Sequence, residues 1–368
     1  MRKISAQYIF TSAGKPLKRG VVTVSDDGTI LAVEDTGGDL AEKAGTEFFN
    51  GIIIPGLVNC HTHLELSHMR GAIPAGRGLI RFIATIRKNR QAGVTEIIRA
   101  AQLADREMYS EGIVACGDIS NNALTIRTKR DSLINYVTFI EVFGVNPLVS
   151  RIRMRNAAKV KAAASAAGLC HYITPHAAYS MSQKLFMLIR DKISGTSVTS
   201  LHFLESEDER KMTGRHIEIV LSLAELTSQL ILVHNTVITE DELKTLSVAD
   251  SIWYCLCPSS NMRISGIMPP VRMFREVVSD HIVTGTDSLA STDHLSILGE
   301  MRLLQDAFPD IPLEEIVRWG TINGARALQL SGTTGSIEPG KKPGLLLIEA
   351  ADLTALRLMP ESRVRRLL

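Results

Sequence analysis

The chain has 368 residues, of which 45% are apolar and 22% are charged, a balance that is typical of globular proteins and excludes a disordered chain. The 41 Lys and Arg residues nearly match the 39 Asp and Glu residues, and no long basic run occurs, so nucleic acid is not an expected partner. No run approaches the roughly 20 apolar residues of a membrane span, and we expect a cytoplasmic protein without a membrane partner.

Both ends of the chain have β-type character. The first part alternates short apolar runs with turn signals, and "DDGT" at 26–29 indicates a hairpin. Near the other end, "GSIEPGKKPGLLLIE" at 335–349 is a Pro- and Gly-rich turn that leads into an apolar strand. We therefore predict one small β-sandwich domain that is assembled from residues 1–52 and 335–368.

The region between these ends, residues 53–334, alternates helical periodicity with short β-rich runs. For example, "SRIRMRNAAKVKAAASAAG" at 150–168 precedes "LCHYITPH" at 169–176, and the rhythm continues to "HIVTGTDS" at 281–288. This alternation implies parallel strands that are joined by crossover helices. Because roughly eight such units can be counted, we predict an α/β fold with a closed (β/α)8 TIM barrel.

The predicted strands end in residues that can bind a metal ion or move a proton. His61 and His63 close the first of these strands, and the later strand ends carry His176, His202, Glu205, His234 and Asp287. The C-terminal ends of barrel strands converge on the active site. We therefore expect these side chains to surround one opening.

The pair His61 and His63 is the first candidate metal site. In an extended segment their side chains leave the same face about 6.5–7 Å apart along the strand. Taken alone, such a pair fits surface or turn histidines equally well. Together with His202 and Asp287, the pair supplies three nitrogens and one oxygen. This set suits one zinc ion that keeps a coordination position for water, and iron and manganese are alternatives.

Two other strand-end residues suit proton transfer. A bound divalent ion can lower the pKa of water to about 7, and Glu205, three residues after His202, could carry that proton to a leaving nitrogen. The alternative interpretation of Glu205 is a surface carboxylate in the acidic run "ESEDE". His234 ends an apolar strand, where an unpaired imidazole is costly. We expect it to stabilise the attacking water, although alone it would be interpreted as a core histidine.

Eight segments, which occur in family order and span most of the chain, resemble the amidohydrolase superfamily. They are "IIPGLVNCHTHLELSHMRG", "ITPHAAYS", "SLHFLESEDE", "LVHNT", "CPSSNMRISG", "VTGTDSLAS", "TINGARALQL" and "GSIEPGKKPGLLLIE". They are most similar to its mononuclear aminohydrolase and chlorohydrolase branch, which includes guanine, S-adenosylhomocysteine and aminofutalosine deaminases. One departure is Pro343-Gly344, where the family usually has Ala-Asp in its β-sandwich.

The resemblance implies a role for each strand-end residue. These roles are metal ligation by His61, His63, His202 and Asp287, proton shuttling by Glu205, orientation of the nucleophilic water by His234, and substrate binding by His176. Asp287 is also expected to accept a proton from water. Glu65 and His68 stay without an assigned role.

The implied activity is metal-dependent hydrolytic deamination of an amino-substituted heteroaromatic ring, such as a purine nucleoside, with aminofutalosine as one candidate. A chlorohydrolase or cyclic-amide hydrolase with the same metal is the alternative, because these enzymes share most of the ligands. A non-enzymatic, metal-dependent binding protein would not need both Glu205 and His234. The expected partner is a small-molecule substrate, and the apolar content is compatible with a homodimer.

Overall fold

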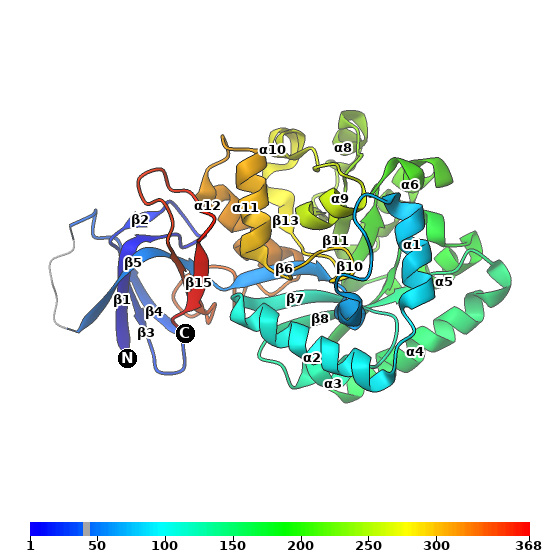
Figure 1. Ribbon diagram of the computed structural model, residues 1–368, viewed down its shortest axis with the longest axis horizontal. Helices are drawn as coiled ribbons and strands as arrows, with labels where there is room; N and C mark the ends of the chain where they lie inside the picture. Colours follow the sequence, from blue (N-terminus) through cyan, green and yellow to red (C-terminus); the bar gives the residue numbers. More distant parts are fainter. Residues whose placement is uncertain (40–44) are drawn as a thin grey trace. The chain divides into compact units, whose positions relative to one another are not determined.

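The computed structural model describes residues 1–39 and 45–368 of the chain (Figure 1). The chain divides into two compact units, of which the first contains 1–59, 108–115 and 296–368 and the second contains 60–107 and 116–295. Residues 40–44, within the predicted terminal domain, lie outside the described residues. The domain boundaries given above remain a prediction.

Both chain ends contribute to one seven-stranded sheet in the first unit. Its order is β15-β14-β5-β1-β3-β4, with β2 paired to β1. The strands are β1 (Arg2–Ile9), β2 (Leu17–Lys18), β3 (Val21–Val24), β4 (Ile30–Glu34), β5 (Thr46–Pro55), β14 (Leu345–Glu349) and β15 (Arg363–Arg366). The predicted hairpin is confirmed, because β3 and β4 pair antiparallel around Gly28, whose φ of +84° suits glycine. Buried aliphatic side chains such as Ile4, Ile53 and Leu347 form the core of this sheet.

The apolar run 52–60 is divided between two sheets. Pro55 ends β5, whereas Leu57 begins β6 (Leu57–Thr62). Gly56 lies at the break, where a Cβ atom would meet the Val114 side chain at 2.3 Å and the Pro343 carbonyl oxygen at 2.5 Å. The chain therefore changes sheets at a position that only glycine fits.

Eight further strands form two four-stranded sheets, ordered β6-β7-β8-β9 and β10-β11-β12-β13. Beyond β6 these strands are β7 (Ile113–Ser120), β8 (Asn135–Val142), β9 (Cys170–Pro175), β10 (Thr196–Phe203), β11 (Thr227–His234), β12 (Ile252–Leu256) and β13 (Ile282–Thr284). The β8–β9 pairing and all pairings of the second sheet are parallel. Isolated parallel bridges also join Thr62 to Asp287 and Ala177 to His202.

Helices alternate with these strands, which confirms the predicted α/β class (Figure 1). The α-helices are α1 (Gly78–Asn89), α2 (Val94–Ser110), α3 (Ile126–Arg130), α4 (Ser150–Ala166), α5 (Gln183–Ile193), α6 (Glu207–Met212), α7 (His216–Ala224), α8 (Glu240–Leu246), α9 (Pro258–Ile264), α10 (Val271–Val278), α11 (Ile297–Ala307), α12 (Leu313–Arg318) and α13 (Gly324–Ala327). Shorter helical turns are η1 (Leu64–Met69), η2 (Pro147–Val149), η3 (Ala178–Ser180), η4 (Ser279–His281) and η5 (Trp319–Asn323). Among the described helices, none has the length and apolar character needed to cross a membrane.

Two glycines allow close approach to the strand that carries His61. At Gly117 in β7, a Cβ atom would lie 2.6 Å from the carbonyl oxygen of Cys60 and 2.9 Å from a ring carbon of Phe139. At Gly285, just after β13, a Cβ atom would lie 2.9 Å from the Cβ of His61. The absence of both side chains therefore determines how tightly β6 packs against its surroundings.

Replacing Gly117 with Ala should destabilise the protein by about 1–3 kcal/mol, because overpacking displaces neighbouring backbone and side chains. Gly214→Ala is the matched control, since a Cβ atom there meets no atom within 4 Å. Denaturant unfolding of both variants measures the difference. Equal free energies of unfolding for the wild type and the Gly117 variant would contradict the packing argument.

Candidate active site

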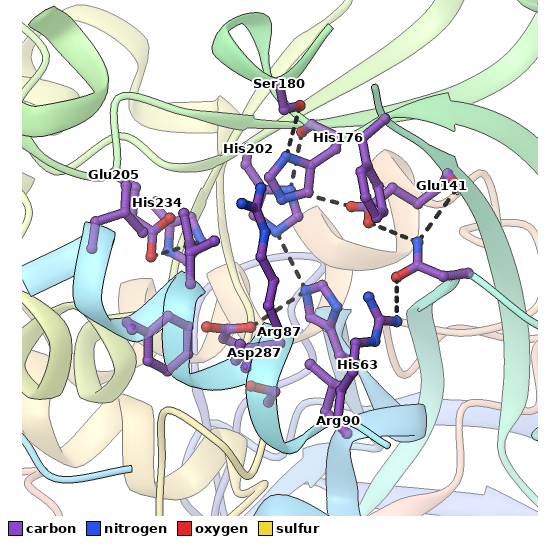
Figure 2. A pocket seen from close by; sticks show the side chains of 18 of the residues that line it. His63, Arg87, Arg90, Glu141, His176, Ser180, His202, Glu205, His234 and Asp287 are labelled. Atoms are coloured by element: carbon purple, nitrogen blue, oxygen red, sulfur yellow. Dashed lines mark hydrogen bonds and ion pairs between the residues drawn. The ribbon is translucent and has the colours of Figure 1, made fainter. Parts of the chain in front are cut away.

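The strand-end residues of the second unit surround one open pocket (Figure 2). The pocket is lined by six of the seven predicted site residues, His63, His176, His202, Glu205, His234 and Asp287. The seventh, His61, is fully buried and contacts His63. Helix α1 supplies an apolar wall through Leu79, Phe82, Ile83 and Ile86. The predicted residues therefore meet around one opening.

Four of the predicted residues bring ligand atoms close together. His63 Nε2 lies 3.1 Å from His61 Nε2 and 3.3 Å from His202 Nε2. Asp287 Oδ1 lies 3.6 Å and 3.5 Å from the Nε2 atoms of His61 and His63. Ligands at about 2.0–2.1 Å from a tetrahedral zinc ion are about 3.3 Å apart. The spacing and the chemistry of this four-donor cluster, defined as His61, His63, His202 and Asp287, therefore fit a zinc-type ion.

Hydrogen bonds away from the four-donor cluster orient two of its members. His202 Nδ1 donates to the carbonyl oxygen of His176 at 3.1 Å, which leaves the Nε2 lone pair facing the cluster. Asp287 Oδ2 accepts hydrogen bonds from the hydroxyls of Ser260 and Ser291, each at 2.7 Å. Outer partners of this kind fix ligand orientation. Neither serine was predicted from the sequence, because isolated serines carry no signal of such a role.

The backbone adopts uncommon conformations at three strand ends of the site. The φ angles are +48° at Leu204, +79° at His234 and +59° at Asp287. Positive φ is unfavourable for residues with a side chain and costs about 1–3 kcal/mol. Leu204 lies between His202 and Glu205 in the sequence and immediately precedes Glu205. His234 and Asp287 are themselves predicted site residues. This concentration of strain is typical of functional sites.

Burial sets the charges of the cluster. Burial lowers the pKa of His63 to about 4 and that of His234 to about 3, so both imidazoles are neutral at pH 7. Burial by itself would raise the pKa of Asp287, but the surrounding imidazoles, beginning with His61, lower it below the usual range. Neutral imidazoles and an ionised carboxylate are the forms that bind a divalent cation.

Glu205 and His234 lie beside the four-donor cluster. His234 Nε2 is 3.8 Å from Glu205 Oε1, and the rings of His234 and His202 have centroids 5.4 Å apart. Burial, reinforced by the carboxylates of Asp287 and Glu209, raises the pKa of Glu205 well above its usual range. A carboxyl group of this kind can hold a proton between two steps of a reaction near neutral pH.

Glu209 supports the backbone of Glu205. It is fully buried, and its Oε2 accepts a hydrogen bond from the Glu205 backbone N–H at 2.8 Å. Glu209 was not predicted from the sequence, although it belongs to the same acidic run as Glu205. The spacing of four residues places Glu209 within reach of that backbone after one helical turn, a signal that could have identified it.

His176 lies against the cluster from the next strand end. Its ring stacks on that of His202 with centroids 4.6 Å apart, and its Nδ1 is hydrogen-bonded to Ser180 Oγ at 3.0 Å. The ring lines the pocket, where a substrate can reach it. His68, by contrast, is not among the residues that line this pocket.

A polar network that the sequence analysis did not predict forms another part of the pocket wall (Figure 2). Glu141 Oε2 accepts a hydrogen bond from Asn121 Nδ2 at 2.8 Å, and Arg90 donates to Asn121 Oδ1 at 3.3 Å and to Glu65 Oε1 at 3.1 Å. Glu65 also accepts from the Asn121 backbone N–H at 3.0 Å. Glu65 thus ties η1 to the end of β7. Glu141 ends the apolar run "YVTFIEV", so the strand-end rule could have found it.

A buried ion pair holds the chain directly after His63. Asp118 Oδ1 accepts a hydrogen bond from the Leu64 backbone N–H at 2.7 Å, and Asp118 Oδ2 accepts from Lys129 Nζ at 2.8 Å. Both side chains of the ion pair are completely buried. Since Leu64 follows His63, the pair restrains the segment that carries two members of the four-donor cluster.

The site contains three imidazoles and a carboxylate at the ends of α/β strands, and a separate acid–base pair lies beside them. This combination of groups is typical of a metal-dependent hydrolase. Residues 52–364 match the Amidohydrolase family, and the chain belongs to this family. The resemblance that its motifs suggested is therefore confirmed.

Known proteins similar to this chain include deaminases and a chlorohydrolase. The 5-methylthioadenosine/S-adenosylhomocysteine deaminase of Pyrococcus abyssi is 27% identical over 331 residues, which cover 84% of this chain and 76% of the relative. The structure of Helicobacter pylori aminofutalosine deaminase has a TM-score of 0.78 at 21% identity and covers 100% of this chain and 98% of that one. A variant of atrazine chlorohydrolase from Arthrobacter aurescens TC1, complexed with zinc and atraton, has a TM-score of 0.78 at 16% identity, with coverages of 99% and 93%. The predicted activity and its alternative thus both occur among similar proteins.

Replacing Lys129 with Met should destabilise the protein by about 3–5 kcal/mol, because the Asp118 carboxylate would remain buried without its cation. Lys244→Met is the matched control, since Lys244 forms its ion pair with Glu240 on the surface, where such pairs contribute little. Thermal and denaturant unfolding measure both variants. If the two variants were equally stable, the buried pair would not have the anchoring role described.

Proposed function

We propose that this protein is a metal-dependent hydrolytic deaminase that releases ammonia from an amino-substituted heteroaromatic ring, such as that of a purine nucleoside. Aminofutalosine is one candidate substrate. The observation that carries the proposal is the four-donor cluster with its separations of 3.1–3.6 Å, beside which Glu205 and His234 stand as a separate pair. Membership of the amidohydrolase family and the names of the similar deaminases support it.

In this proposal His61, His63, His202 and Asp287 hold one divalent ion. Such an ion, when bound, makes water a nucleophile near neutral pH by lowering its pKa to about 7. We favour zinc because three imidazole nitrogens and one carboxylate oxygen suit it and because the similar chlorohydrolase is complexed with zinc. Iron would use the same ligands.

The remaining steps belong to residues of the chain. Glu205 accepts a proton from the water that attacks the ring carbon, and it delivers a proton to the nitrogen when the carbon–nitrogen bond breaks and ammonia leaves. The raised pKa of Glu205 suits it to hold this proton in between. Neutral His234 orients the water by hydrogen bonding, Asp287 serves as a second proton acceptor, and His176 contacts the substrate ring.

The leaving group distinguishes the proposal from its alternative. Chloride leaves as an anion and needs no proton, whereas an amino group leaves only after protonation. A buried glutamate with a raised pKa, as at Glu205, is therefore more useful to a deaminase than to a chlorohydrolase. A cyclic-amide hydrolase would also need a protonated nitrogen, so it stays as the second candidate.

We further propose that the two four-stranded sheets close into one (β/α)8 barrel. The parallel bridges Thr62–Asp287 and Ala177–His202 support this, since they join the outer strands of the two sheets or the residues next to them. The seven-stranded sheet would then belong to a β-sandwich domain. A cytoplasmic location and a homodimer also remain proposals.

Metal-replete protein should release ammonia from at least one compound in a screen of aminopurine nucleosides, free aminopurines, pterins and aminopyrimidines, because its acid–base pair suits an amine leaving group. Metal analysis of the same preparation should find about one divalent ion per chain. Metal-free protein is the control and should be inactive until the ion is restored. Hydrolysis of a chlorinated triazine or a cyclic amide, with no ammonia from any amino compound, would contradict the assignment.

Glu205→Gln should lower turnover by about 10²–10⁴-fold, the usual contribution of a general acid–base group. Its metal content should stay unchanged, because Glu205 is not one of the proposed ligands. Glu207→Gln is the matched control from the same acidic run, since Glu207 is exposed and should tolerate the change. Full turnover in the Glu205 variant would remove this residue from the mechanism.

A further inference from the structure

We propose that Glu141 binds the 2′- or 3′-hydroxyl group of the substrate's sugar substituent and thereby makes the enzyme select nucleosides over free bases. This inference rests on the proposed deamination and adds a residue that determines its specificity. Glu141 lies at the end of β8 and faces the active-site pocket (Figure 2). Its side chain is only 2% exposed, so its hydrogen bonds must come from protein or ligand.

One oxygen of Glu141 is satisfied and the other is not. Oε2 accepts the hydrogen bond from Asn121 Nδ2 at 2.8 Å, which fixes the orientation of the carboxyl group. Oε1 is buried and has no hydrogen-bond partner among the described residues. A buried acceptor without a donor costs about 1–3 kcal/mol, and more when it is charged. The position therefore suits a ligand that brings an O–H or N–H donor.

The neighbouring histidines do not supply that donor. His202 Nδ1 is 3.6 Å from Glu141 Oε1, but its proton is used by the His176 carbonyl oxygen at 3.1 Å. Glu141, His176 and His202 also have ligand atoms within 4.8 Å of one another. A cation bound by these three residues would need one ring nitrogen of His202. Its Nδ1 is protonated, and its Nε2 belongs to the four-donor cluster. A neutral donor is thus the better partner for Glu141.

The position of Glu141 indicates which part of the substrate carries the donor. Glu141 lines the active-site pocket and also a second cavity, and Arg90, Asn121 and Phe143 are likewise common to both. A substrate whose amino group lies at the four-donor cluster can extend past Glu141 into this second cavity. The donor then belongs to the substituent rather than to the reacting ring.

The walls of the second cavity suit a polar substituent. They include Asn122, Asn156 and Arg153, and the guanidinium of Arg153 lies over the ring of Phe143, 5.4 Å from its centroid. Amide and guanidinium groups bind hydroxyls well and gain little from a hydrocarbon. By contrast, α1 lines the active-site pocket mainly with apolar side chains, and Arg87 is its charged residue there. A hydroxylated substituent that points away from α1 satisfies both surfaces.

The test compares adenosine, 2′,3′-dideoxyadenosine and adenine on the wild type and on Glu141→Gln, with metal-loaded protein. Glutamine preserves the size of the side chain and can keep the Asn121 contact through its amide oxygen, but it turns an amide N–H₂ toward the ligand. The wild type should bind and deaminate adenosine about 10–100-fold better than the dideoxy compound, the usual loss for a missing bond to a charged group.

The variant should lose about 10–100-fold with adenosine and stay within about twofold of the wild type with dideoxyadenosine, so that the two nucleosides become equivalent. An equal loss for both nucleosides, or no loss, would overturn the proposal. A loss with adenine as large as that with adenosine would place the donor on the ring and overturn the hydroxyl assignment. Glu207→Gln, an exposed change, is the control variant.

Calorimetric binding separates this inference from the proposed function. If the wild type binds adenosine more tightly than dideoxyadenosine, and the variant does not, Glu141 has the assigned role even when no ammonia is released, and deamination alone is then wrong. If adenosine does not bind to the wild type, the nucleoside assignment is overturned. The comparison between ligands on the wild type needs no variant. It therefore tests the proposal even if Glu141→Gln folds poorly.

Discussion

The gathering of buried polar atoms at one place is the constraint on which the rest of the structure depends. Three imidazole nitrogens and a carboxylate oxygen lie 3.1–3.6 Å apart on side chains that are almost fully buried, an arrangement that is costly unless a cation satisfies it. The glycines beside β6, the serines at Asp287 and the Asp118–Lys129 pair all restrain the chain near these atoms. Strained φ angles at Leu204, His234 and Asp287 belong to the same arrangement.

Burial also separates the residues by charge. The same loss of solvent that keeps His63 and His234 neutral raises the pKa of Glu205, whereas Asp287 stays ionised because imidazoles surround it. Groups whose pKa values move in opposite directions can divide the roles of ligand and proton carrier. The pocket therefore combines a cluster of donor atoms that suits a cation with a group that can take up and release a proton, as the proposed hydrolysis of a carbon–nitrogen bond requires.

Much of the fold and of the candidate site was predictable, because both follow from periodic patterns. Alternating helical and β-type stretches predicted the α/β class, and the rule that strand ends converge found the residues that now line or underlie one pocket. Glu141 follows the same rule, but a single carboxylate near the end of an apolar strand is a weaker signal than a histidine pair. The division of residues 52–60 between two sheets was not predictable, since it depends on contacts of Gly56 with Val114 and Pro343, which are distant in the sequence.

The sequence by itself determined which groups are available and on which strand ends they lie, because side-chain chemistry and local periodicity are properties of short segments. Only the tertiary structure decided how these groups are paired. The donation from His202 to His176, the serines that orient Asp287, the support of Glu205 by Glu209 and the unpartnered oxygen of Glu141 all depend on atoms from separate segments or on the turns between them. Distances of a few tenths of an ångström decide such contacts, and no local pattern in the sequence encodes them.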